Sequence, residues 1–277
     1  MDTATHMLRT GRRGALFQLQ MAQKDLVNSF RRMGLAWSLA THDVASRYRG
    51  SVLGPFWITL SMGLMVLGIG VLYANLFDLP LQQFLPYVAF GIVFFGVMTG
   101  TVTEGCETFV QASGMLSQTS LPMLTFVWRT VFRNLINLAH HAVIVVAMLV
   151  VYGYWREAGY LQALLGILLM LANASWASLL AGIASARFRD IPPIVMSVMQ
   201  FALFMTPVFW MPDRLGRHQA ILDWNPFYHL LHAVRAPLLG EPVRLESYGV
   251  LVAMAVVGWT VAFLIFARTR RRIVHYL

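Results

Sequence analysis

Long apolar blocks separated by short polar stretches dominate the chain, and six of these blocks are long enough to cross a membrane. A bilayer crossing takes about 20 consecutive apolar residues in an α-helix, and a helix satisfies its own backbone polar groups, as lipid requires. We therefore predict an all-α polytopic membrane protein with six transmembrane helices. The predicted spans are residues 56–77, 84–103, 134–152, 160–186, 191–211 and 248–267.

Two segments on the predicted cytoplasmic side are amphipathic or polar rather than continuously apolar. Within residues 33–53, Met33, Trp37, Ala40 and Val44 share one helical face, which predicts an amphipathic helix at the membrane interface followed by a linker. The stretch 104–125 is polar enough to leave the membrane and long enough for a short cytoplasmic helix. Proline disfavours helical geometry in the residue before it, so Pro122 should mark the boundary with the next helix.

A third segment, residues 221–240, lies on the predicted outer side before the last span. One helical face is polar and carries His229, His232 and Arg235. The other face is apolar and carries Phe227, Leu230, Leu231, Val234 and Leu238. The segment is too short and too polar to cross, so we predict an amphipathic or re-entrant helix at the outer leaflet.

Composition and charge set the orientation of these segments. The 277 residues are 58% hydrophobic and 12% charged, and the formal net charge is +9. With the N-terminus inside, 16 of the 21 Lys and Arg residues fall on the cytoplasmic side of the predicted spans, as the positive-inside rule demands. We therefore expect cytoplasmic tails at 1–32 and 268–277, a membrane domain over 54–267, and basic residues that serve topology rather than nucleic-acid binding.

The motifs of an enzyme or an ion-coupled carrier are missing from the sequence. No G-x-x-x-x-G-K-[ST], H-E-x-x-H or G-x-S-x-G occurs, and Cys106 is the single cysteine. The sequence therefore predicts no catalytic residue, metal site or cofactor in this chain. No Asp or Glu lies within a predicted span, although coupled carriers usually need such intramembrane groups.

The remaining polar residues of the spans have simpler interpretations than chemistry. His140 and His141 are adjacent in the sequence and point about 100° apart on a helix, so we interpret them as packed, hydrogen-bonded side chains rather than a relay. Arg129 and Arg133 lie just before the third span, and we interpret them first as membrane anchors. His229 and His232 lack a third ligand and are interpreted as a polar interfacial face.

Small residues recur at the spacing that allows close helix approach. Gly96 and Gly100 form a G-x-x-x-G pair in the second span. A stripe of every fourth residue follows the fourth span, at Ala174, Ser178, Gly182 and Ala186. Such stripes let helices pack closely in membranes, and we expect this contact within one subunit.

The run D-V-A-S-R-Y-R-G-S-V-L-G-P-F-W before the first span resembles the corresponding region of the ABC-2 family of permeases. The likeness is strongest to subunits that export lipid-linked polysaccharide such as O antigen, capsule or teichoic acid. Two weaker stretches occur in the same order, S-L-P at 120–122 and W-N-P-F-Y at 224–228. The resemblance covers about 35–270, and its first motif contains Asp43, Arg47, Tyr48, Arg49, Ser51, Leu53, Gly54, Pro55 and Trp57.

The resemblance implies a half-transporter in the bacterial inner membrane. Two copies would form the path for the polymer, and two cytoplasmic ABC ATPase subunits would bind ATP and Mg²⁺. The loop at 104–116 would hold the coupling helix that docks into the ATPase, beside the interface helix with Trp37 and Asp43. The coupling residues implied are Glu104, Glu107, Phe109, Met115 and Leu116.

Aromatic side chains in the second, fourth and fifth spans are our candidates for the lining of the path. They are Tyr87, Phe94, Phe95, Trp176, Phe201 and Phe204. Lipid-linked polysaccharide, with O antigen favoured over capsule, is the predicted substrate. A drug or small-lipid exporter of the same family, a passive channel or secondary carrier without an ATPase, and a membrane-embedded transferase are the alternatives.

Overall fold

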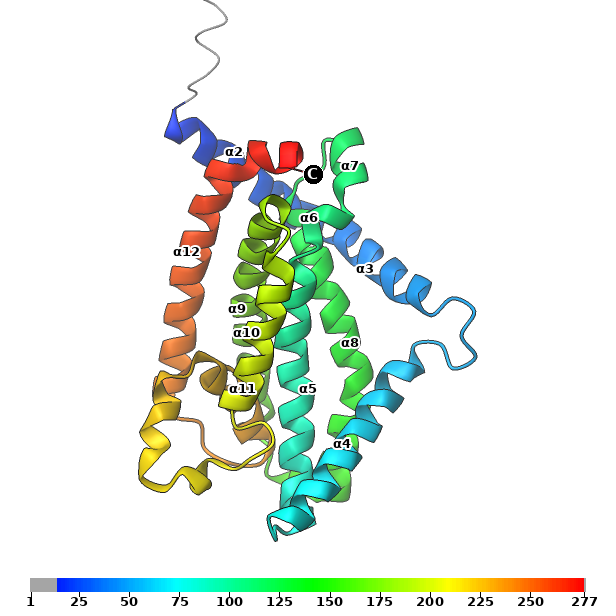
Figure 1. The fold of residues 1–277 in the computed structure, drawn as a ribbon, viewed down its shortest axis with the longest axis vertical. Coiled ribbons are helices and arrows are strands. Elements are labelled where there is room, and N and C mark those ends of the chain that lie inside the picture. Colours follow the sequence, from blue (N-terminus) through cyan, green and yellow to red (C-terminus); the bar gives the residue numbers. More distant parts are fainter. Residues whose placement is uncertain (1–13, 277) are drawn as a thin grey trace, which may run out of the picture.

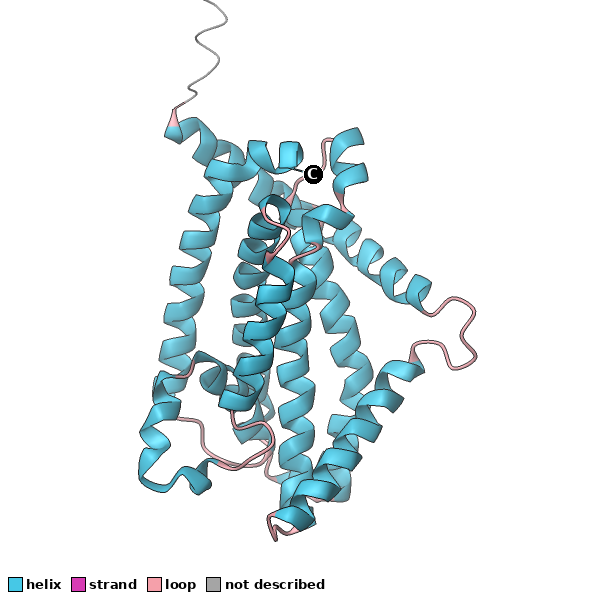
Figure 2. Ribbon diagram, viewed as in Figure 1, coloured by secondary structure: helices cyan, strands magenta, loops and turns pink. Residues whose placement is uncertain are grey.

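A computed structural model describes residues 14–276, and all regular structure in that range is helical. Long helices run roughly along one direction and are joined by short connections (Figures 1 and 2). One end of this bundle holds α2 (Ala15–Arg31), α6 (Thr108–Gln111), α7 (Ser113–Gln118) and the last turns of α12 (Leu245–Tyr276) (Figure 1). We call it the basic end, because α12 carries its arginines 268–272 there.

Five helices are long and apolar enough to cross a membrane. They are α4 (Phe56–Leu76), α5 (Leu81–Gly105), α8 (Leu124–Val151), α9 (Tyr160–Arg187) and α12. Three of them, α4, α5 and α9, agree with the predicted spans to within three residues at each end. The most apolar stretch of α5 is 78% buried, whereas that of α4 is 17% buried. α5 is therefore the centre of the bundle, and α4 lies at its edge.

The fifth predicted span is shorter than expected. α10 (Ile191–Met205) has 15 residues, or about 22 Å of helix, and Thr206 is extended with ψ 139°. The cause is Pro207, which disfavours helical geometry at Thr206. The predicted span 191–211 treated one apolar run as one helix, but the helix ends at Met205. α10 is therefore a shorter apolar helix and is not one of the five long enough to cross.

Two helices extend beyond the predicted spans. α8 begins at Leu124, ten residues before the predicted start at 134, and so contains Arg129 and Arg133. α12 continues to Tyr276 through the predicted tail. Charged residues end an apolar run without ending a helix, since Arg is a good helix former.

The predicted tail 1–32 contains a helix over its described part, residues 14–32. α2 packs with Leu19, Ala22 and Leu26 against α12 and α8. The buried Asp25 carboxylate accepts hydrogen bonds from the backbone N–H groups of Met123 and Leu124 at 3.1 Å each. These are orphan donors at the start of α8, so α2 caps α8 from a distance of about a hundred residues in the chain.

A helix, α3 (Met33–Arg47), covers most of the segment 33–53 in which an interface helix is predicted. Ala36, Ala40 and Val44 form its buried face, and Trp37 is 46% exposed with its ring edge against Phe132. The following linker to α4 turns at Gly50 (φ 83°) and Gly54 (φ 55°), where a side chain would be strained.

The predicted amphipathic helix of the other end is α11 (Pro226–Leu238), after the 3₁₀ segment η2 (Pro212–Trp224). Both of its faces are buried: His229 and Arg235 are 6% and 2% exposed, as hidden as Leu231. The expectation that its polar face meets solvent or headgroups is wrong for these two residues, because α5, α9 and α12 surround the helix. We call this end of the bundle the α11 end (lower part of Figure 1).

The stripe of small residues packs within the subunit, as expected. Ser178 of α9 lies against Gly105 of α5, so close that a Cβ on Gly105 would be 2.7 Å from the Ser178 Cα. Gly182 faces the Gly105 carbonyl in the same contact, where an added Cβ would be 2.9 Å away. Close approach of this kind is what small residues provide in lipid, where no hydrophobic force joins helices.

Candidate functional site

Three helices meet at a network of charged side chains near the basic end. Arg129 of α8 donates two hydrogen bonds to the Asp43 carboxylate of α3, at 2.6 and 2.7 Å. Arg133, one turn on, donates to Asp43 at 3.1 Å and through Nε to Glu104 of α5 at 2.7 Å. Arg47 lies 3.8 Å from the other Glu104 oxygen. This charge network ties α3 to two long helices.

The charge network is only partly exposed to solvent, and this changes the interpretation of its arginines. The Arg133 side chain is 6% exposed and that of Asp43 is 16% exposed. Burial raises the pKa of Asp43, but hydrogen bonds and positive charge from Arg129 and Arg133 outweigh it, so the pKa lies below its ordinary value. Arg129 and Arg133 are therefore links between helices, and the prediction that they serve as membrane anchors is wrong.

The loop after α5 is folded onto the bundle by its central aromatic residue. Phe109 of α6 is fully buried and lies against Gly182 of α9. The Thr108 hydroxyl lies 2.9 Å from that of Thr130 in α8. In contrast, Glu107, Val110 and Gln111 are exposed. Of the predicted coupling residues, Glu107 is on the surface, Met115 is half-buried, and Glu104, Phe109 and Leu116 point inward.

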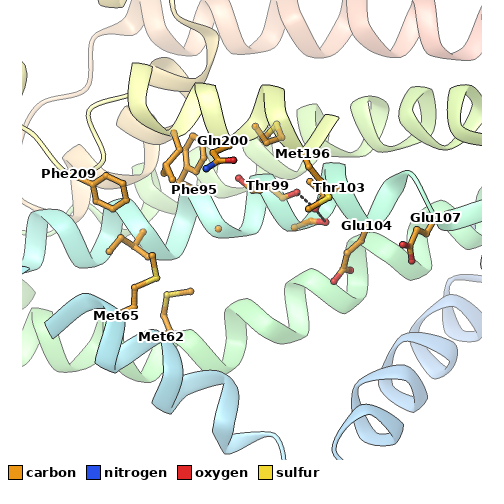
Figure 3. A pocket seen from close by; sticks show the side chains of 15 residues that line it. Met62, Met65, Phe95, Thr99, Thr103, Glu104, Glu107, Met196, Gln200 and Phe209 are labelled. Carbon is orange, nitrogen blue, oxygen red and sulfur yellow. Dashed lines mark hydrogen bonds between the residues drawn. The ribbon is translucent and has the colours of Figure 1, made fainter. Parts of the chain in front are cut away.

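A groove of about 680 Å³ lies between α4, α5 and α10 (Figure 3). We call it the α4–α10 groove. Met62 and Met65 line one side and Met196 and Gln200 the other, with Phe95, Thr99 and Thr103 of α5 between them. It reaches Glu104 and Glu107 towards the basic end and Phe209 towards the α11 end.

The floor of the α4–α10 groove carries one polar atom without a partner. The Thr103 hydroxyl donates to the Thr99 carbonyl at 2.7 Å. The buried Thr99 hydroxyl has no hydrogen-bond partner among the described residues. Buried polar groups are normally satisfied, so the Thr99 hydroxyl is an exception among the residues that line the groove.

The predicted aromatic lining divides into four groups. All three members of the set in α5 are buried, but Phe95 borders the α4–α10 groove, whereas Phe94 and Tyr87 do not. Phe201 and Phe204 are 65% and 59% exposed and are absent from the groove wall. Trp176 packs against Gly258 of α12 and borders a separate apolar cavity of about 300 Å³. Phe95 is thus the one member of the set that faces this groove.

At the α11 end, a buried arginine supports the break after α10. The Arg235 guanidinium lies 3.7 Å from the centre of the Tyr87 ring and donates to the Pro207 carbonyl at 2.7 Å. The Tyr87 hydroxyl lies within 3.0 Å of the same carbonyl and 3.1 Å of that of Trp210. Irregular backbone at membrane depth needs such partners, which explains why a cation is buried here.

Asn225 of the W-N-P-F-Y stretch joins the two helices on either side of it. Its Oδ1 accepts from the backbone N–H groups of Phe227 and Tyr228 at the start of α11. Its Nδ2 donates to the Met205 carbonyl, the last of α10, at 3.1 Å. One amide therefore caps both helix ends.

The histidines of the described range make separate contacts. His229 bonds through its two ring nitrogens to Ser247 and to the Asp223 carbonyl. His140 bonds within its own helix to the Ile136 carbonyl, and the Nδ1 of His141 has no partner among the described residues, contrary to the expected hydrogen bond. Within residues 14–276 no group of three His, Cys, Asp or Glu side chains could hold a metal.

The first motif has a local structural role in addition to the network. Ser51 accepts a hydrogen bond from the Gly54 backbone N–H at 3.2 Å, and Pro55 precedes the first residue of α4. Tyr48 borders a cavity of about 300 Å³ with Arg47, Asn137 and His141. Arg49 and Leu53 are exposed in the linker.

Comparison with known proteins assigns this geometry to a family. The chain matches the family described as ABC-2 type transporter over residues 35–239, and it belongs to that family. Its members are multi-pass membrane subunits of ABC exporters that lack the ATPase site and work with an ATPase partner. The O-antigen export system permease protein RfbA of Myxococcus xanthus is 24% identical over 233 residues, which are 81% of this chain and 87% of that protein.

Sequence reasoning missed four residues that hold the site together. Asp25, Arg129, Arg133 and Arg235 were assigned to tails, anchors or a polar face, yet all four make buried or half-buried contacts. A signal existed for Asp25, since Leu19, Ala22, Leu26 and Ser29 recur at helical spacing around it. No pattern in the sequence pairs Arg235 with Pro207.

Proposed function

We propose that this chain is the permease subunit of an ATP-driven exporter of lipid-linked polysaccharide in a bacterial inner membrane. O antigen is the favoured substrate and capsule the next. Two copies would form the path, and two ABC ATPase subunits would bind the basic end, which we assign to the cytoplasm. Family membership and the O-antigen permease relative support the class and direct the choice of substrate.

The observation that carries this proposal is the chemistry of the α4–α10 groove. Methionine and phenylalanine side chains give an apolar surface, and Thr99, Thr103 and Gln200 supply isolated polar atoms. Binding sites for amphiphiles combine a largely apolar wall with a few placed polar groups. A sugar chain on a lipid carrier needs both. The thioethers also adapt to varied shapes, which suits a polymer that slides.

A second copy would complete the groove. α4 is largely exposed along its length, and α10 exposes Met196, Phe201 and Phe204 beside the groove. A polymer crossing a bilayer must be screened from lipid on all sides, but one subunit offers only an open wall. Pairing two copies through α4 and α10 would enclose a path and cover these apolar faces.

The exposed edge of the loop after α5 is the proposed docking surface for the ATPase. Glu107, Val110 and Gln111 would contact the partner, and Phe109 would transmit the displacement because it is fixed against α9. The charge network links the same region to α3 and α8. ATP-driven closure of the partner pair would thus bias a bistable membrane part.

Photo-crosslinking tests the docking surface. A photoreactive amino acid at Val110, in the full chain expressed in its own host, should crosslink to a protein containing a Walker A motif. The matched control is the same substitution at Ile221, which is also exposed but lies at the α11 end. Equal labelling from both positions, or none from Val110, would contradict the assignment.

Export in cells tests the substrate and the groove. In cells that lack the native chain, Met65→Ala and Phe209→Ala, which alter partly exposed groove residues, should reduce surface polymer while the protein level stays normal. Phe94→Ala serves as the comparison, since Phe94 is buried beside Phe95 and should act through stability instead. Unchanged export by both groove variants would remove the α4–α10 groove as the path.

A further inference from the structure

A second groove lies on the outside of the bundle, at the membrane side of the basic end. It has a volume of about 470 Å³ and is formed by three helices. We call it the α2–α12 groove. Its walls are Leu26 and Phe30 of α2, Trp128 of α8, and Trp259, Thr260, Phe263 and Leu264 of α12.

The walls of the α2–α12 groove are held in place by specific contacts. The Trp128 and Trp259 rings are stacked with centroids 5.8 Å apart, and Phe30 lies 5.2 Å from Trp128. Each indole N–H is also fixed: Trp128 donates to the Ser29 hydroxyl and Trp259 to the Ala172 carbonyl, both at 3.1 Å. The groove is therefore preformed rather than a gap between loose side chains.

The charge around the α2–α12 groove is almost entirely positive. Asp25 is the single acidic residue in 14–32 and 258–276. Its carboxylate is already bound by Arg270 at 2.9 Å and by the start of α8. The other basic residues of these two segments are exposed, namely Lys24, Arg31, Arg32, Arg268, Arg271 and Arg272.

The order of residues along α12 places the apolar wall of the groove at the depth of lipid chains and the arginines at the depth of lipid headgroups. Thr260 and Leu264 lie four to eleven residues before Arg268 and Arg271, a separation of about 6–16 Å along the helix. The wall thus falls inside the apolar span, and the arginines fall where headgroups begin. Arg271 also lies over the Phe17 ring at 5.4 Å, which keeps the charge beside α2.

We propose that the α2–α12 groove is a binding site for an anionic phospholipid. An acyl chain would lie on the Phe30, Trp128 and Phe263 rings, and the phosphate would meet Arg268 and Arg271. Basic pockets between helices on the cytoplasmic side suit anionic headgroups. The site stands independently of the export substrate, because it faces away from the α4–α10 groove and uses none of its residues.

Native mass spectrometry of the purified full chain tests the site with phosphatidylglycerol and phosphatidylcholine as probes. The wild type should bind phosphatidylglycerol more tightly than phosphatidylcholine. Arg268→Gln and Arg271→Gln should each weaken the binding of phosphatidylglycerol by about fivefold. The binding of phosphatidylcholine should not change. Thr260→Trp, which fills the groove, should remove the tight site for both lipids.

Matched controls separate a built site from diffuse attraction. Val252→Trp adds the same bulk to an exposed position of α12 away from the groove, and Arg156→Gln removes a positive charge elsewhere. If Thr260→Trp binds phosphatidylglycerol like Val252→Trp, or if the Arg268 and Arg271 variants bind like Arg156→Gln, the proposal is overturned.

A second measurement covers the case in which Thr260→Trp fails to fold. A photoreactive residue at Thr260 is irradiated in native membranes, and the mass of the adduct is measured. A gain of one phospholipid supports the proposal. A protein adduct would show that the groove holds another polypeptide and would overturn it.

Discussion

At the basic end Arg133 lies between two carboxylates of other helices, whereas at the α11 end Arg235 lies between a backbone carbonyl and a tyrosine ring. The first arginine is neutralised by groups that carry their own charge and sit on separate helices. The second is held by neutral groups and supports a broken helix. A charge in the first setting can exchange partners when helices move, but one in the second cannot move without losing its hydrogen bond to the Pro207 carbonyl while it stays buried.

This difference indicates where the molecule can move. The partly exposed charge network joins α3, α5 and α8 next to the proposed docking loop. The exposed arm of this network, between Arg47 and Glu104, can be remade at modest cost. Asn225 instead joins the start of α11 to the Met205 carbonyl of α10, and Arg235 of α11 and Tyr87 of α5 both donate to the Pro207 carbonyl. We expect rearrangement at the basic end and rigidity around Pro207.

The largest effect should come from Arg235→Met. The variant loses a charged hydrogen bond and a desolvated cation–π contact, so we expect a loss of about 3 kcal/mol in unfolding free energy. The measurement is the thermal unfolding midpoint of the purified chain in detergent. Arg217→Gln, an exposed arginine at the same end, is the control and should change little. Equal midpoints for the two variants would contradict the structural role.

The next effect should come from Arg133→Met, at about 2 kcal/mol. Asp43 keeps Arg129, whereas Glu104 loses its close arginine and keeps only the Asn134 amide at 2.9 Å and the more distant Arg47. The double variant Arg133→Met/Glu104→Gln should recover part of this loss, since it removes the unpaired carboxylate. Double-mutant analysis of unfolding midpoints measures the recovery. No such rescue exists for Arg235, whose partners carry no charge. Additive effects at positions 133 and 104 would break the contrast between the two ends.

Acid should weaken the basic end before the α11 end. Because the folded-state pKa of Asp43 is lowered, its contribution to stability is present above its unfolded pKa of about 3.9 and is lost as pH falls through the folded value. The partners of Arg235 do not titrate in this range. Unfolding midpoints between pH 7 and 3 should therefore fall less steeply for Asp43→Asn than for the wild type. If the midpoints of the two proteins fell in parallel with pH, the ion pairs of Asp43 with its arginines would not contribute to stability.

The apolar runs predicted α4, α5 and α9 closely, because in lipid a span must be both helical and apolar. They failed where another interaction decided the boundary. Arg129 and Arg133 lie in a helix since Asp43 and Glu104 neutralise them, and α10 ends at Met205 since Pro207 follows. Such boundaries depend on contacts between residues far apart in the chain, which periodicity cannot contain.

The sequence predicted which segments hold the candidate residues, but not which way their side chains point. The loop 104–116 is indeed at the end of the bundle with α2 and α12, yet the burial of Phe109 comes from Gly182, about seventy residues away. Likewise, Phe94 and Phe95 are adjacent in the sequence, and only the packed bundle shows that both are buried and that Phe95 alone borders the groove. Helical phase is known from a sequence, but the neighbour on each face is not.

The smallest effect, and the one that bears on transport alone, is expected for Thr99→Val. Valine has nearly the same shape as threonine, and the Thr99 hydroxyl has no partner among the described residues. The free energy of unfolding should therefore stay within about 0.5 kcal/mol of the wild-type value. Polymer export should fall by roughly two- to tenfold if a sugar hydroxyl bonds there, which is the range for one lost hydrogen bond. Thr269→Val is the control, since that threonine bonds to the Ile265 carbonyl at the end of α12. Full export by Thr99→Val would mean that the groove recognises its cargo without this hydroxyl. Reduced export with a lowered midpoint would instead place Thr99 among the structural residues, with Arg133 and Arg235.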